Sequence, residues 1–82
     1  MPLTFSEADP DRPAKEARLH AMGEVELLAL YNETRKAASD ARRAHDMETL
    51  YPLARGMKTI QRIAGERGLV IRARRFEKSS NA

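Results

Sequence analysis

The architecture of the chain follows from residues 24–45, EVELLALYNETRKAASDARRAH, where the helical pattern is clearest. Apolar or small side chains recur there every three or four residues, at Leu27, Leu30, Tyr31, Thr34, Ala38 and Ala41. This spacing places them on one side of an α-helix. Because the stripe ends in alanines, a second helix can approach closely at that end.

A second helix is predicted after the turn HDME at residues 45–48. Thr49 is expected to cap it, and Pro52 to fall in its first turn, where a missing N–H costs no hydrogen bond. Gly68 is expected to end it at a positive φ. The apolar stripe of this helix is Leu53, Met57, Ile60 and Ala64, flanked by Leu50 and Ile63. Two glycines inside it are either sites of close backbone approach or simple defects: Gly56 and Gly65.

Two helices joined by a short turn form an antiparallel hairpin, so the sequence predicts an all-α fold. A short helix over residues 14–22 precedes the hairpin, and residues 1–11, with two prolines, are interpreted as a flexible or extended arm. The helical domain then covers residues 12–68, and a basic segment covers 69–82. Both tyrosines are expected to pack at or beside the seam between the helices: Tyr31 and Tyr51.

The small size of the chain favours self-association. Its 82 residues make one domain, and a core of that size rarely supplies more than about 3–5 kcal/mol. There is no cysteine to form a disulfide. One pair of helices leaves four apolar side chains half covered: Val25, Leu28, Leu50 and Ile63. We therefore expect a homodimer with a four-helix arrangement.

Membrane insertion and catalysis have no support in the sequence. No apolar run approaches the roughly 18 residues of a membrane span, and the N-terminus lacks a signal-peptide pattern. With the absence of cysteine, this indicates a cytoplasmic location and no membrane partner. The two histidines fit no metal-binding motif, and no phosphate loop or nucleophile elbow occurs. We expect no enzymatic activity, no metal and no cofactor.

Charge is distributed unevenly along the chain. Residues 1–54 carry seven Lys and Arg against ten Asp and Glu, a net −3, whereas residues 55–82 carry eight against two, a net +6. Such asymmetry is typical of a surface that binds a polyanion. Seven cations are predicted to contact phosphate groups: Arg55, Lys58, Arg62, Arg72, Arg74, Arg75 and Lys78. Phe76 is predicted to stack on an unpaired base.

The segment LVIRARRF, residues 69–76, fits either a strand or a short helix. As one strand, it places Arg72 and Arg74 on the same face as Phe76. The residues before it resemble the first helix and turn of a helix-turn-helix: Ile60, Ile63, Ala64, Gly68 and Leu69. The resemblance implies a recognition helix next, but Val70 and Ile71 stand where a capping Ser, Thr or Asp is usual. A helix stop followed by a basic extension explains the same residues.

Two functions fit these patterns. The first is a small nucleic-acid-binding protein, a regulatory or accessory factor that contacts the phosphate backbone of DNA or RNA through a basic C-terminal ridge. The second is a protein–protein adaptor or inhibitor that docks on a larger partner through its helical hairpin and meets an acidic protein surface with its basic end. The net charge of residues 55–82 favours the first.

Overall fold

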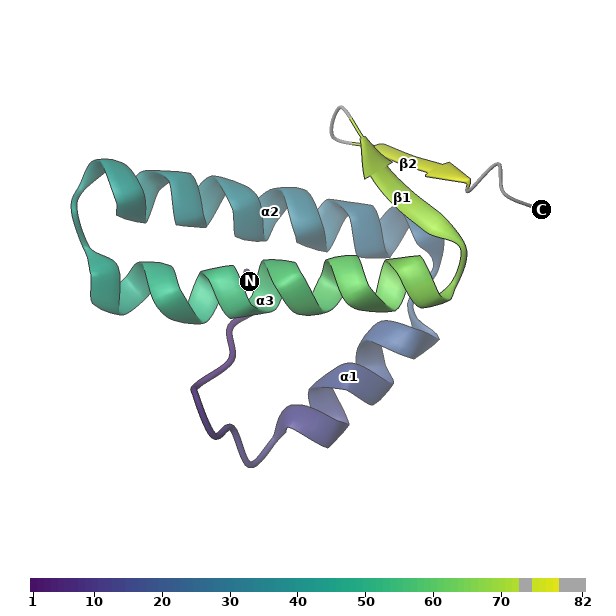
Figure 1. Cartoon of the computed structure of the whole chain (residues 1–82), viewed down its shortest axis with the longest axis horizontal. Helices are drawn as coiled ribbons and strands as arrows, with labels where there is room; N and C mark the ends of the chain where they lie inside the picture. The colour runs from purple at the N-terminus through teal and green to yellow at the C-terminus, as the bar shows by residue number, and fades with distance from the viewer. Residues whose placement is uncertain (73–74, 79–82) are drawn as a thin grey trace.

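The computed structural model of the chain is mainly helical, as predicted (Figure 1). It describes residues 1–72 and 75–78, and for residues 72 and 75–78 it describes the backbone only. Three helices come first: α1 (Arg12–Ala21), α2 (Glu24–Arg43) and α3 (Met47–Glu66). Two short strands follow: β1 (Leu69–Arg72) and β2 (Arg75–Lys78).

Helices α2 and α3 lie side by side in opposite directions and bury their apolar stripes against each other (Figure 1). The buried residues of α2 are Leu27, Tyr31, Thr34, Ala38 and Ala41. Those of α3 include Leu50, Leu53, Ile60, Ile63 and Ala64. This seam matches the predicted one closely, because both stripes follow the helical period.

The turn between α2 and α3 is built around His45, which has a φ of 56°. The N–H groups of His45 and Asp46 bond back to the carbonyls of Arg42 and Ala41, which closes the end of α2. Asp46, rather than the predicted Thr49, caps α3. Its carboxylate accepts hydrogen bonds from the backbone N–H (3.2 Å) and hydroxyl (2.6 Å) of Thr49.

The earlier start of α3 changes the role of Pro52. This residue lies inside the helix and not in its first turn, so the missing N–H costs α3 one internal hydrogen bond. The carbonyl of Pro52 accepts a hydrogen bond from the N–H of Phe5 (3.1 Å). The prediction that Pro52 would be free of cost is therefore wrong.

Residues 1–11 run across α2 and α3. Phe5 is fully buried, and the N–H of Leu3 donates to the hydroxyl of Thr34 (2.9 Å). The arm explains Gly56, because a Cβ there would overlap the carbonyl oxygen of Leu3. A Cβ at Gly65 would meet no atom within 4 Å. Of the two glycines inside α3, only Gly56 is thus a site of close backbone approach.

Helix α1 packs against α3 and covers part of the surface that motivated the prediction of a dimer. Its buried Leu19 belongs to the same apolar cluster as Ile63. Leu50 is also buried within the single chain, and Leu28 is half-buried. Val25 remains 84% exposed. Three of the four residues that were expected to require a second copy are therefore covered at least in part without one.

After Gly68, which has the predicted positive φ (78°), the chain enters a two-stranded antiparallel hairpin. The residues Leu69–Arg72 form β1, so they do not supply the second helix of a helix-turn-helix. Strand β1 packs on α3 with Leu69 buried, and β2 packs on α2. The hairpin thus lies over one end of the helical pair (Figure 1).

Candidate nucleic-acid interface

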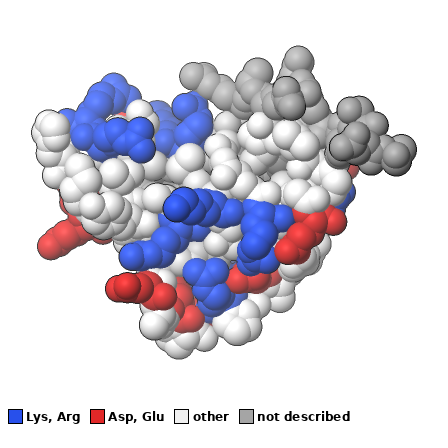
Figure 2. Space-filling model, in the orientation of Figure 1, with Lys and Arg blue, Asp and Glu red and all other residues white. Residues whose placement is uncertain are grey.

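The three predicted phosphate contacts on α3 form a row along the side of the helix that faces away from α2. Arg55, Lys58 and Arg62 follow one another at intervals of three and four residues, so they lie on one side of the helix. Figure 2 shows a band of basic side chains across the front of the molecule, along the line of α3, with acidic side chains at its right-hand end and below it. The three differ in how much of their charge is compensated.

Arg62 is neutralised within the chain. Its guanidinium pairs with Glu16 of α1 and with Glu66 of α3 (3.0 Å). The hydrogen bond from Arg62 holds the pKa of Glu16 below its usual value, and the same pairing raises the pKa of Arg62. A phosphate group would have to compete with two carboxylates for this side chain.

Arg55 and Lys58 keep their charge. Arg55 donates from Nη1 to the carbonyl oxygen of Phe5 (3.2 Å), which orients the guanidinium without cancelling its charge. A guanidinium has five N–H donors, so others are left for a ligand. Lys58 is exposed, and among the described residues it has no hydrogen bond or ion pair.

The remaining predicted contacts belong to the C-terminal hairpin. Arg72 is paired with Arg75 across the two strands, Ile71 with Phe76 and Leu69 with Lys78. Because successive strand positions alternate between faces, positions 76 and 78 share the face of Leu69, which packs on the helices. Positions 72 and 75 share the opposite face. The turn of the hairpin therefore separates positions 72 and 76, which a single strand would place together.

Arg74, also predicted as a phosphate contact, lies outside the described residues. For Arg72, Arg75, Phe76 and Lys78 the structure gives the register positions and not the side chains. The structure thus brings α3 and the basic hairpin together, since β1 packs directly on α3.

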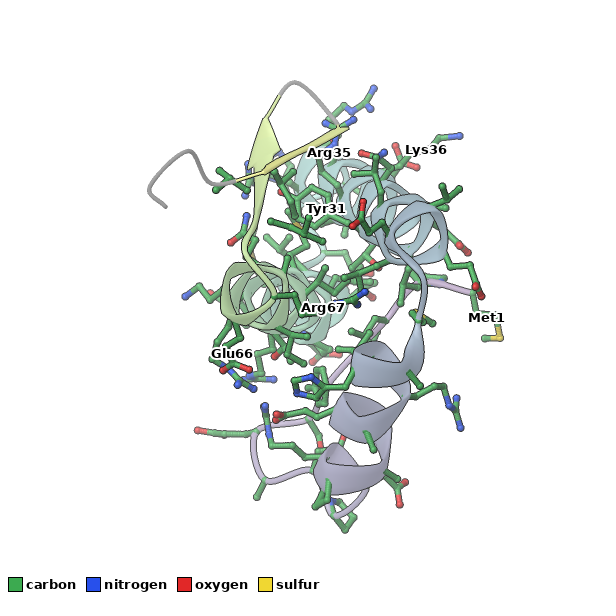
Figure 3. The ribbon with its side chains drawn as sticks, turned by 90° about the vertical axis from the view of Figure 1, so that its right-hand side faces the viewer. Met1, Tyr31, Arg35, Lys36, Glu66 and Arg67 are labelled. Carbon is green, nitrogen blue, oxygen red and sulfur yellow. The ribbon has the colours of Figure 1, made fainter. Side chains whose placement is uncertain are left out.

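A group of cations on α2 was missed by the prediction, which looked for phosphate contacts only in the net-positive residues 55–82. Figure 2 shows basic side chains gathered over α2, and Figure 3 shows Arg35 on the side of α2 near the hairpin. Arg42 follows Arg35 by seven residues, so both lie on the same side of the helix. The buried Nε of Arg35 has no hydrogen-bond partner within the described ranges. The seven-residue spacing was the available signal.

Two cations near the N-terminus have structural roles. The guanidinium carbon of Arg12 lies 4.4 Å from the centre of the Phe5 ring. Lys15 donates to the carbonyl of Thr4 (2.9 Å) and to the carboxylate of Asp9 (2.8 Å). The Lys15 ammonium, with the N–H groups of Asp11 and Ser6, lowers the pKa of Asp9 to about 2.

Within residues 1–72 and 75–78, no helix is long and apolar enough to cross a membrane. Comparisons of the chain with protein-family models, with curated proteins and with solved structures found no match.

Proposed function

We propose that the protein is a small nucleic-acid-binding accessory factor that contacts the phosphate backbone. The proposal depends on one observation: residues 55–82 carry eight Lys and Arg against two Asp and Glu, a net charge of +6. These residues belong to α3 and the hairpin, two elements that pack on each other. Charge-dominated contact of this kind selects phosphate groups and not base sequence.

The proposal assigns phosphate contact first to Arg55 and Lys58, which keep their charge. Arg72 and Arg75 are added because their register positions share the hairpin face opposite to Leu69. Arg62 contributes less, since its charge is compensated by two carboxylates. Phe76 is left out as a stacking residue because its position shares the face that packs on the helices. Arg35 and Arg42 of α2 extend the positive surface.

The direct test is a titration of labelled single-stranded DNA, duplex DNA and RNA, followed by fluorescence anisotropy at two salt concentrations. We expect micromolar binding at low salt that weakens steeply with salt, by about 0.9 in the log–log slope for each duplex phosphate neutralised. Absence of micromolar binding to all three ligands at low salt would overturn the proposal.

Two charge-reversal variants test whether the α3 row is the binding surface. Lys58→Glu should weaken binding strongly because Lys58 belongs to the α3 row. Arg18→Glu makes the same change in net charge on α1, where Arg18 is exposed and lies outside the row. Equal losses from the two variants would show that only net charge matters.

The alternative function, an adaptor or inhibitor that docks on a larger protein through the helical hairpin, is favoured by one observation. Val25, near the start of α2, is 84% exposed. Under this alternative Val25→Ser disrupts association and nucleic-acid affinity is negligible. Under the first proposal Val25→Ser leaves nucleic-acid affinity unchanged. Sedimentation of the wild type and this variant also measures whether Val25 supports the homodimer expected from the sequence.

A further inference from the structure

Tyr51 continues the row of cations on α3. The residues Tyr51, Arg55, Lys58 and Arg62 are separated by four, three and four positions, so they share one side of the helix. Three aromatic side chains are described, Phe5, Tyr31 and Tyr51. Phe5 is fully buried, Tyr31 is 7% exposed and Tyr51 is 57% exposed. The expectation that Tyr51 packs at or beside the seam is therefore wrong.

The neighbours of Tyr51 are suited to hold a phosphate group. Arg55 lies one turn further along, at the spacing where helical side chains are about 5–6 Å apart at Cβ. The carbonyl of Phe5 orients its guanidinium (3.2 Å). Lys58 lies a further turn along, about 10 Å from Tyr51 along the helix axis. An exposed ring is thus followed by an oriented guanidinium and an ammonium that is unpaired among the described residues.

We infer that this end of α3 binds unpaired nucleotides, with a base stacked on the ring of Tyr51 and the adjoining phosphate at Arg55 and Lys58. The inference rests on the proposed function and specifies its ligand as single-stranded nucleic acid. Every base has a π-face that stacks on an aromatic ring, but in a duplex those faces are already stacked on neighbouring bases. Tyr51 takes the role that the sequence suggested for Phe76.

The charges along α3 also indicate where the nucleic-acid strand lies on the helix. At the far end of the row, Arg62 is held by Glu16 and Glu66, so the uncompensated charge lies at the end that carries Tyr51. Glu48, one turn before Tyr51, is acidic and exposed, and it repels phosphate groups beyond the ring. The nucleic-acid strand is therefore expected to run from Tyr51 toward Lys58.

The composition of the chain permits a direct optical test. There is no tryptophan and there are two tyrosines, so the variant Tyr31→Phe leaves Tyr51 as the sole emitter. The substitution removes one hydrogen bond, which Gln61 donates to the Tyr31 hydroxyl (3.1 Å). Oligo-dT should quench Tyr51 over the concentration range in which anisotropy reports binding, and a blunt duplex should not. Free tyrosinamide in the same titration corrects for absorption by the nucleic acid.

Affinity measurements on Tyr51 variants complete the test. Tyr51→Ala should lose about tenfold in affinity for oligo-dT, the scale expected for one stacked base. Tyr51→Phe keeps the ring and should bind like the wild type, and neither variant should change affinity for the duplex. Circular dichroism checks that both variants remain helical.

The outcomes separate this inference from the proposed function. If the wild type binds neither oligo-dT nor duplex, the proposed function fails and the inference fails with it. If the wild type binds both, but Tyr51 is not quenched or Tyr51→Ala binds oligo-dT normally, the inference alone is overturned. Equal losses for single strand and duplex in Tyr51→Ala would also overturn it, because stacking requires an unpaired base.

Discussion

Two flanks of α3, one turned toward the arm and α1 and the other turned outward, differ in the side chains they carry. On the flank toward the arm and α1, Gly56, Thr59 and Ile63 are buried, and the hydroxyl of Thr59 donates to the carbonyl of Arg55 (2.9 Å). On the outward flank, Lys58 is exposed and Arg55 has donors left over. The first flank is committed to holding the fold. The second retains hydrogen-bonding capacity for a ligand, which is why we place the interface there.

Two cations of the outward flank contact the N-terminal segment and so connect the two flanks. Arg55 is held by the carbonyl of Phe5 in the arm, and Arg62 is held by Glu16 in α1. The N-terminal segment therefore does more than cover apolar surface. It orients one cation of the α3 row and neutralises another.

The largest effect is expected from Phe5→Ala, because this ring is fully buried between the arm and the helices. Removing a buried phenyl ring costs about 3–5 kcal/mol of unfolding free energy. Urea denaturation followed by circular dichroism measures the loss. An arm that moves freely in solution would instead give a loss near zero.

Alanine substitutions at the two glycines of α3 form a matched pair, and they should change stability in opposite directions. Gly56→Ala should destabilise the protein by about 1–3 kcal/mol, because the new methyl group overlaps the backbone of Leu3. Gly65→Ala meets no atom within 4 Å, so it should stabilise α3 by up to about 1 kcal/mol. Thermal denaturation of the two variants measures both changes. The same sign for both would contradict the close approach of the arm at Gly56.

The arm also predicts a pH dependence, through Asp9. Its pKa in the folded protein is about 2, below the ordinary value of 3.8, because Lys15 and two backbone N–H groups bind the carboxylate. A lowered pKa means that this carboxylate stabilises the fold above pH 3.8 and loses that effect as the pH falls toward 2. The difference in unfolding free energy between the wild type and Asp9→Asn should therefore shrink over this range. A difference that does not change with pH would place Asp9 outside the contacts of the folded arm.

The parts of the fold that follow a local period could be predicted, and the parts that depend on distant contacts could not. The seam residues Leu27, Tyr31 and Ile60 were visible because helical spacing alone places them on one side. The burial of Phe5 could not be predicted, because the arm is held by distant residues. The carbonyl of Phe5, for example, accepts a hydrogen bond from Arg55, which lies 50 positions away. No local sequence pattern predicts such a contact.

The same limit applies to the candidate interface. The row Arg55, Lys58 and Arg62 follows from spacing, but its partial neutralisation does not, because Glu16 lies 46 positions from Arg62. The exposure of Tyr51 depends on which side of α3 packs on α2. The sequence pattern did not fix this side closely enough to tell a residue beside the seam from an exposed one. Charge counts located the basic elements, and only the fold distinguishes compensated cations from free ones.

The smallest effect, and the one that best tests the link between the two flanks, is expected from Glu16→Gln. This change removes one of the two carboxylates that compensate Arg62, so only Glu66 still competes with phosphate for that cation. An exposed ion pair is worth about 0.2–1 kcal/mol, so affinity for nucleic acid should rise by a factor of about 1.5 to 5. The salt dependence on duplex DNA should steepen by no more than about 0.9 in the log–log slope.

The matched control for this prediction is Glu26→Gln, which makes the same change in net charge at an exposed position near the start of α2. A larger gain for Glu16→Gln than for Glu26→Gln would show that losing the Glu16 contact makes Arg62 more available to phosphate. Equal gains would mean that net charge alone sets affinity. In that case α1 does not tune the row, and its contact with Arg62 serves only to hold α1 against α3.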